Sequence, residues 1–466
     1  MVTYESIYIV FVSEESDCVK QDLTTGRIGG VLLRFSLPMM LGNLLQQLYN
    51  VADTLIVGQI LGADALAAVG SAYTLMTFLT SILLGLCMGS GVIFSIQYGE
   101  KDDERLKSSL FASFVFIGAC TLILNIAVFV WIDPILHLLQ VPDEVYSLMR
   151  RYLLIIFIGI AATFLYNYFA SLLRAVGNTL VPLIFLGAAA LLNIGLDLLF
   201  VIGFRWGVEG AAAATVAAQF ASGFGLAAYF RIRFPEWRIP RRCMRMRRGV
   251  LAEISRYSLL TCMQQSIMNF GILMVQGLIN SFGPTVMAAF AAAVKIDSFA
   301  YMPVQDFGNA FSTFAAQNVG AKKPERIQSG IKLAVRMVLM FCLGISSVVM
   351  LFAKPLMLLF VQPQETEVLA VGVKYLRIVG AFYWGIGCLF LLYGYYRAVK
   401  KPGMSVILTI VSLGTRVALA YTLSAIPAVG VVGIWWSVPI GWLLADLMGY
   451  GYYRLHKKDL CDRMQS

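Results

Sequence analysis

Long apolar stretches alternate with short polar segments along almost the whole of this 466-residue chain. Charged residues and Gly/Pro positions mark the breaks, and the apolar stretches reach the roughly 20 residues that a helix needs to cross a bilayer. We therefore predict twelve membrane-spanning helices. Their approximate limits are 31–58, 65–97, 106–132, 145–173, 179–202, 208–230, 252–281, 286–318, 327–353, 366–395, 402–425 and 430–453.

Composition supports this pattern. The chain is 59% hydrophobic and only 13% charged, and its mean hydropathy is +0.77. A soluble domain would be about half apolar with roughly twice this charge density, and a membrane β-barrel would show short alternating segments instead. The sequence therefore predicts an all-α polytopic membrane protein.

Lys and Arg set the expected orientation. An even number of spans puts both termini on one side, and 27 of the 36 basic residues lie on that side, against six on the other. The positive-inside rule then places both termini in the cytoplasm, with the protein in the cell membrane (plasma or inner). The net charge of +10 comes from these loops, so it indicates contact with anionic lipid and not with nucleic acid.

The start of the chain does not read as a signal peptide, because the apolar stretch at 8–12 is too short and Glu14, Glu15 and Asp17 follow it. It is either a disordered tail or an over-extended start. We expect a cytoplasmic tail at 1–27, an N-lobe at 28–230, a basic cytoplasmic connector at 231–250, a C-lobe at 251–455 and a cytoplasmic tail at 456–466.

The two halves of the chain repeat each other. LGADALAAVGSAYTLMTF (61–78) aligns with FGPTVMAAFAAAVKIDSF (282–299) at an offset of 221, and GVEG (207–210) aligns with GVVG (430–433) at an offset of 223. Six helices per copy is an even number, so the copies share one topology and are related by a pseudo-two-fold axis along the membrane normal. Such repeats are typical of transporters that rock one half against the other.

Several polar residues lie inside the apolar stretches. The first predicted helix carries them at steps of three, four and three, which is one helix face: Asn43, Gln46, Asn50 and Asp53. The fifth places Asn193 and Asp197 four residues apart, and Asn167 and Thr215 lie in the fourth and sixth. A carboxylate that faces lipid costs at least ~3 kcal/mol at mid-membrane, so these residues must face a cavity or the bundle interior.

The repeat serves as a control for the acids. Asp53 aligns with about Val275, Asp197 with Ala420 and Asn193 with Arg416, so the second half has no counterpart of the acid pair. If the acids only held six helices together, both copies would need them. The asymmetry favours a cation or proton site in the first half over an interhelical hydrogen-bond network, which membrane helices also use.

Two carboxylates close together in a poorly hydrated pocket resist being ionised at the same time, so the pair takes up a proton. Asn and Thr oxygens beside them suit a hard cation such as Na⁺ equally well. We expect no cofactor and no other metal ion, because the eight Cys contain no CxxC pair and His137 and His456 are the only histidines. Pro38, before Asp53 on the same helix, is a bend point or an ordinary proline near a helix start.

The second half carries other charges within its helices: Lys295, Asp297, Asp306, Arg416 and Asp446. Internal ion pairs explain them more simply than substrate contact, because unpaired charges at this depth are rare. The residues that we expect to line a cavity or contact substrate are Gln46, Asn50, Gln265, Asn269 and Arg416.

With these residues in view, the chain resembles the multidrug and toxic compound extrusion (MATE) family, in its DinF-like branch, over roughly 21–455. DLTTGRIGGVLLRFSLPMMLGNLLQQLYNVADTLIVGQILGADALAAVG (22–70) is similar to the family's first-helix pattern, and FSTFAAQNVGAKKPERI (311–327) to its pattern after the eighth helix. The resemblance implies two six-helix bundles in a V shape around a central cavity, and extrusion driven by an inward H⁺ or Na⁺ gradient.

The resemblance also implies a cation site in the N-lobe. The residues that match it are Asp53, Asn167, Asn193, Asp197 and Thr215, and Pro38 matches the family's bend proline. The sequence departs from the family in a longer N-terminal extension. Its C-lobe also lacks the acidic pair that another branch uses, so the resemblance does not imply coupling through the C-lobe.

We therefore predict a secondary active multidrug efflux antiporter that exports amphipathic, often cationic organic compounds in exchange for H⁺ or Na⁺ by rocking-bundle alternating access. Asp53 and Asp197 would carry the coupling ion, so that ion and drug occupancy exclude each other. The expected partners are small organic cations and the lipid bilayer, and we expect a monomer.

Two other functions compete with this prediction. A flippase for lipid-linked oligosaccharides or peptidoglycan precursors, from the same superfamily, would need a cavity rich in Arg and Lys to hold a pyrophosphate. Only Lys295, Arg336 and Arg416 lie within the predicted helices, which counts against it. A membrane-embedded enzyme would need a nucleophile, a metal cluster or a His-based constellation, and the sequence offers none, so we expect no enzymatic activity.

Overall fold

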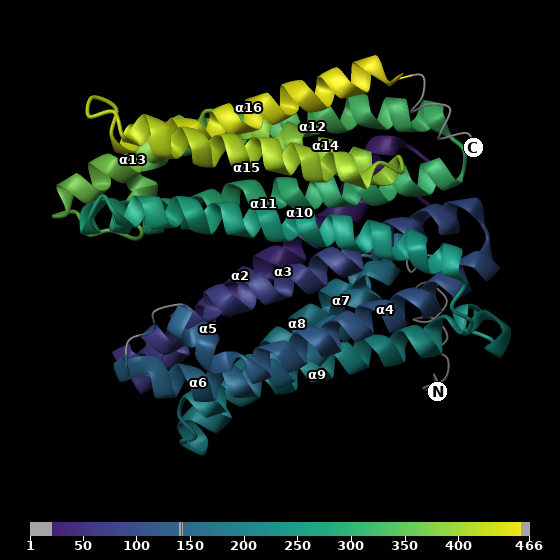
Figure 1. Cartoon of the computed structure of the whole chain (residues 1–466), viewed down its shortest axis with the longest axis horizontal. Helices are drawn as coiled ribbons and strands as arrows, with labels where there is room; N and C mark the ends of the chain where they lie inside the picture. Colours follow the sequence, from purple (N-terminus) through teal and green to yellow (C-terminus); the bar gives the residue numbers. More distant parts are fainter. Residues whose placement is uncertain (1–20, 139–140, 142, 458–466) are drawn as a thin grey trace, which may run out of the picture. The chain divides into compact units, whose positions relative to one another are not determined.

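The computed structural model describes residues 21–457, apart from 139–140 and 142, and all regular elements in this part of the chain are helices (Figure 1). The α-helices are α2 (Ile28–Leu61), α3 (Ala63–Glu100), α4 (Asp103–Val130), α5 (Ile132–Leu138), α6 (Asp143–Ile158), α7 (Ile160–Ala175), α8 (Leu180–Asp197), α9 (Val208–Arg233), α10 (Arg248–Asn280), α11 (Pro284–Gly320), α12 (Pro324–Met357), α13 (Thr366–Gly380), α14 (Tyr383–Ala398), α15 (Pro402–Ser424) and α16 (Val431–Leu455). A π-helical turn η1 (Leu198–Gly203) follows α8, and two short 3₁₀ turns, η2 (Pro235–Trp237) and η3 (Arg241–Cys243), lie in the connector.

Within the described residues, ten helices are long and apolar enough to cross a membrane singly. Two further spans are bent pairs: α6 and α7 meet at 43°, and α13 and α14 at 50°, which raises the number to twelve. The predicted fold class, a polytopic helical protein with twelve spans, is confirmed. The sequence did not predict the two bends or the short helix α5.

The backbone confirms the internal repeat. Residues with positive φ occur at matching places in the two halves: Gly62 and Gly283 at 90° and 92°, and Gly207 and Gly430 at 66° and 52°. Each of these four glycines precedes a helix, in a backbone conformation that a side chain would strain. The bends between α6 and α7 and between α13 and α14 also correspond, so the copies share irregular features as well as apolar stretches.

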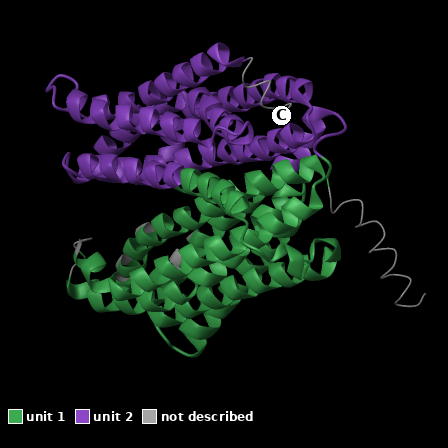
Figure 2. Ribbon diagram, turned by 45° about the vertical axis from the view of Figure 1, so that its right-hand side comes forward, with its two compact units in different colours: residues 1–22, 37–262 green, residues 23–36, 263–466 purple. Residues whose placement is uncertain are grey.

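The described chain forms two compact units (Figure 2). Unit 1 contains 21–22 and Leu37–Cys262, and unit 2 contains Leu23–Ser36 and the chain from Met263 onward. The predicted lobes, 28–230 and 251–455, stay a prediction, and two boundaries of the units, after Ser36 and after Cys262, fall inside α2 and α10. Most of the predicted tail 1–27 and of the tail 456–466 lies outside the described residues.

Hydrogen bonds explain why the segment before α2 belongs to unit 2. The Arg326 guanidinium donates to the carbonyls of Thr25 (2.5 Å) and Gly26 (2.8 Å), and Lys323 Nζ donates to the carbonyl of Thr24 (2.9 Å). The Leu23 backbone N–H also donates to the side chain of Gln317 at 3.2 Å. The junction between α11 and α12 therefore holds the start of α2.

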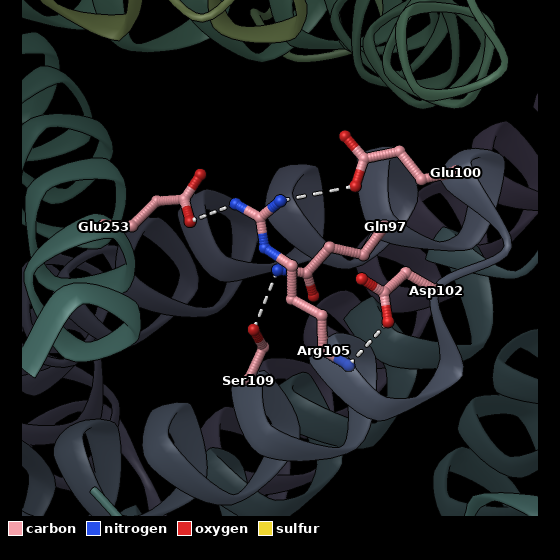
Figure 3. A network of polar contacts seen from close by, with 6 residues as sticks. All are labelled: Gln97, Glu100, Asp102, Arg105, Ser109 and Glu253. Carbon is pink, nitrogen blue, oxygen red and sulfur yellow. Dashed lines mark hydrogen bonds and ion pairs between the residues drawn. The ribbon is translucent and has the colours of Figure 1, made fainter. Parts of the chain in front are cut away.

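The equivalent arginine in the first repeat holds the start of α10 (Figure 3). Arg105 bridges Glu253 in α10 at 2.9 Å and Glu100 at the end of α3 at 3.5 Å. Farther along α10, a Cβ atom added at Gly89 would lie 2.5 Å from the carbonyl oxygen of Tyr257, so α3 and α10 touch backbone to backbone. Small residues permit such close crossings of membrane helices.

Candidate functional site

Asp53 and Asp197, from α2 and α8, meet inside unit 1. Their carboxyl groups are in hydrogen-bonding contact, and Asp197 has no exposed surface. Apart from this contact, Asp53 Oδ1 and both oxygens of Asp197 are buried without a hydrogen-bonding partner among the described residues. Two adjacent buried carboxyl groups without other donors need a proton or a cation between them.

Asn193 and Thr215 complete the polar cluster. Asn193 lies one turn before Asp197 on α8, and its side-chain amide donates to the Thr215 hydroxyl on α9 at 3.3 Å. The Asn193 side-chain carbonyl oxygen receives no hydrogen bond from the described residues. Carboxylate, amide and hydroxyl oxygens thus gather at one place, with unused lone pairs for a hard cation or a proton.

Two tyrosines that the sequence reasoning missed belong to this cluster. Tyr49 lies one turn before Asp53 on α2, and its hydroxyl contacts Thr215. Tyr152, on α6, interacts electrostatically with both carboxyl groups. The i, i+4 spacing of Tyr49 from Asp53 was a usable signal, whereas nothing in the local sequence marks Tyr152.

Asn167 behaves differently from the other predicted site residues. Its side-chain amide donates to the carbonyl of Thr163, one turn earlier on α7, at 2.9 Å. Within the described part of the chain, no hydrogen bond joins it to the acid pair. A role for Asn167 in cation binding stays a prediction.

The polar residues predicted to line a cavity are divided between the units. In unit 1, Gln46 is exposed and Asn50 is half-buried. In unit 2, Gln265 is buried, and Asn269 donates to its backbone carbonyl at 3.3 Å. Their contact with substrate stays a prediction. The same holds for Pro38 as a bend point, since α2 continues through it as one helix.

Unit 2 carries a buried acid of a different kind. Asp297, on α11, accepts a hydrogen bond from the Tyr375 hydroxyl at 2.5 Å and a second from the Tyr383 hydroxyl. The Arg416 guanidinium interacts electrostatically with Asp297 and Tyr375. Two donors and a nearby positive charge stabilise an ionised carboxylate in a medium without water.

The repeat relates these two clusters. Tyr375 corresponds to Tyr152, and Arg416 corresponds to Asn193, at the offset of 223. Unit 1 therefore has an amide and two acids where unit 2 has a guanidinium and one acid. Unit 2 thus has a covalently attached cation, the Arg416 guanidinium, at the position where unit 1 has the neutral amide of Asn193.

A separate cavity lies at the end of α4 that adjoins the connector. It has a volume of about 310 Å³ and is lined in part by Asp102, Glu104, Arg105 and Arg247. Arg105 anchors α10 through its ion pair with Glu253, and Glu104 pairs with Arg242 at 2.8 Å. The cavity is separate from the acid pair, and its ion pairs satisfy one another.

The fold, with its buried acid pair, is that of a multi-span membrane transporter. The chain belongs to the MatE family, whose model matches residues 38–199 and 258–422. It is 30% identical over 436 residues to the probable multidrug resistance protein YpnP of Bacillus subtilis, covering 93% of this chain and 96% of that protein. Assignment to the DinF-like branch stays a prediction.

Two further comparisons are with a curated relative and with a solved structure. A FAD transporter of Shewanella oneidensis is 26% identical to this chain over 463 residues. The alignment covers 96% of this chain and 98% of that transporter. The structure of an outward-facing MATE family multidrug resistance transporter matches with a TM-score of 0.88 at 23% identity, covering 94% of this chain and 98% of that one. The structural match shows the twelve-helix fold and does not identify a substrate.

Proposed function

We propose that this protein is a secondary active exporter of amphipathic, often cationic organic compounds, driven by inward movement of H⁺ or Na⁺. The observation that carries the proposal is the buried contact between Asp53 and Asp197, with open acceptor positions and no counterpart in unit 2. The relatives named as multidrug resistance proteins support the substrate class.

Coupling follows from the charge of the acid pair. An empty pair is anionic and buried, which is costly in an apolar interior, so unit 1 is stable when the pair holds a proton or Na⁺. Neutralising the pair changes how α2, α8 and α9 pack, because Asn193, Thr215 and Tyr49 lie around it. A cationic drug and the coupling ion would compete for the same negative charge, and this competition would produce antiport.

The rival functions receive less support. A flippase for pyrophosphate-linked lipids needs several free basic residues, and Arg416 already faces Asp297, Tyr375 and Tyr301. We place both termini in the cytoplasm and the protein in the cell membrane as a monomer. We assign it no enzymatic activity.

The experiment is ethidium efflux from proteoliposomes with a pH gradient or a Na⁺ gradient imposed separately. Asp53→Asn and Asp197→Asn should abolish gradient-driven efflux while the protein still inserts. Asp64→Asn is the matched control, because Asp64 is an exposed acid of the same unit. Normal pumping by both site variants would show that coupling lies elsewhere, and a wild type that moves no organic cation under either gradient would favour the flippase.

A further inference from the structure

Asp446, on α16, is a half-buried acid that the mechanism above does not use. Both of its carboxyl oxygens are buried, and neither has a hydrogen-bond partner among the described residues. An ionised carboxylate without donors or a counter-ion is strongly unfavourable away from water. The surroundings of Asp446 therefore hold it as a neutral carboxylic acid.

Asp297 provides the contrast within unit 2. It accepts hydrogen bonds from Tyr375 and Tyr383 and lies near the Arg416 guanidinium. These contacts stabilise the ionised form, so Asp297 has no reason to gain or lose a proton in this state. Of the two acids, Asp446 is the one that the structure leaves able to carry a proton.

The repeat shows that the helix crossing does not need this acid. At the offset of 223, Asp446 corresponds to Gly223, and Gly385 on α14 corresponds to Ala162 on α7. In unit 1, a Cβ atom added at Gly223 would lie 2.8 Å from the Ala162 carbonyl oxygen, so alanine and glycine pack closely there.

In unit 2 the glycine of this crossing lies on α14, whereas in unit 1 it lies on α9. A Cβ atom added at Gly385 would lie in ordinary contact with Asp446 Oδ2, at 3.8 Å, so the carboxyl group lies beside Gly385 at the α14–α16 crossing. The same crossing is thus made once with a small pair and once with an acid. An acid inside the membrane without a packing requirement points to a function.

In the described part of the chain, two titratable groups of α14, Cys388 and Tyr393, interact electrostatically with Asp446. The Tyr393 hydroxyl also contacts Thr409 on α15 and interacts with Arg397, near the end of α14. Arg397 in turn donates to the Asn309 side chain at 2.9 Å. Polar groups therefore lead from Asp446 toward the end of α14 that we place at the cytoplasm.

We propose that Asp446 is a second proton-binding residue, which takes up one H⁺ and releases it in each transport cycle, in addition to the ion carried by the acid pair of unit 1. The proposal rests on the proposed export function. The carboxyl group stays neutral while α14 and α16 enclose it. It dissociates to a carboxylate and H⁺ when the crossing opens to water, and it must regain the proton before the crossing can close.

The first test asks whether Asp446 holds a proton. Infrared spectra of the protein in lipid films should show the carbonyl stretch of a neutral, buried carboxylic acid. Asp446→Asn should remove this band, and Asp297→Asn should leave it in place. A second variant, Gly385→Ala with Asp446→Gly, reproduces the small pair of unit 1 and removes the acid.

The second test counts protons. Proteoliposomes with a pH-sensitive dye inside report the H⁺ that enters for each ethidium exported, and both acid-free variants should lower this number by one relative to wild type. An unchanged number, or an unchanged infrared band, overturns the proposal and leaves the export function standing. If wild type shows no ethidium-dependent ion movement at all, the proposed function fails instead, and the infrared band still decides whether Asp446 binds a proton.

Discussion

Asp297 allows a direct measurement of charge inside unit 2. Tyr375→Phe and Tyr383→Phe each remove one hydroxyl that donates to the carboxylate and keep the aromatic ring. The packing of Tyr375 against Trp435, with ring centroids 4.8 Å apart, should therefore persist. The free energy of unfolding then reports mainly on the lost hydrogen bond.

The size of the loss depends on the charge of the acceptor. A hydrogen bond to an ionised group contributes about 1.5–3 kcal/mol, and one between neutral groups about 0.5–1.5 kcal/mol. In the wild-type background, each tyrosine substitution should lower the free energy of unfolding by the larger amount. In the Asp297→Asn background, the same substitution should lower it by the smaller amount. The difference, about 1 kcal/mol for each tyrosine, is the coupling energy of a double-mutant cycle.

The assay is equilibrium unfolding of the purified protein in detergent micelles, with the four members of each cycle measured side by side. Tyr421→Phe is the control, because Tyr421 is an exposed tyrosine of α15, and it should be neutral. If a tyrosine substitution lowers the free energy of unfolding equally in the wild-type and Asp297→Asn backgrounds, the Asp297 acceptor is uncharged. That result would refute the contrast that we draw between Asp297 and Asp446.

Three further predictions test other parts of the structure. Gly89→Ala should destabilise the protein by about 1–3 kcal/mol through overpacking against α10, measured by unfolding, whereas Gly70→Ala, in open space, should not; equal effects would contradict the close crossing. Arg326→Gln should speed amide hydrogen exchange in the segment before α2 about tenfold, for a loss of ~1.4 kcal/mol, and Lys332→Gln should leave it unchanged; protection retained in Arg326→Gln would show that other contacts hold the segment. Thr215→Val should weaken binding of the coupling ion about fivefold, for a lost hydrogen bond of ~1 kcal/mol, measured as the ion concentration at half-maximal efflux; an unchanged value would remove Thr215 from the site.

The sequence by itself determined the class of fold and much of the candidate site. Apolar runs of membrane-spanning length require helices that satisfy their own backbone hydrogen bonds, and the repeat offset relates the halves without any coordinates. Helical spacing also put Asn193 and Asp197 on one face, and the cost of a carboxylate in lipid required both acids to point inward. These conclusions depend on local periodicity and on the solvent, which the order of residues encodes directly.

Only the tertiary structure decided which polar groups meet. Periodicity gives the face of a helix but not the rotation and depth at which it packs on its neighbours, so Tyr152 could not be assigned to the acid pair, nor could Tyr375 and Tyr383 be assigned to Asp297. For the same reason the sequence could not show that the Asn167 amide donates to the Thr163 carbonyl on its own helix. Asp446 and Asp297 are both isolated acids in the sequence. In the structure, two tyrosine hydroxyls donate to Asp297, whereas neither oxygen of Asp446 has a hydrogen-bond partner among the described residues.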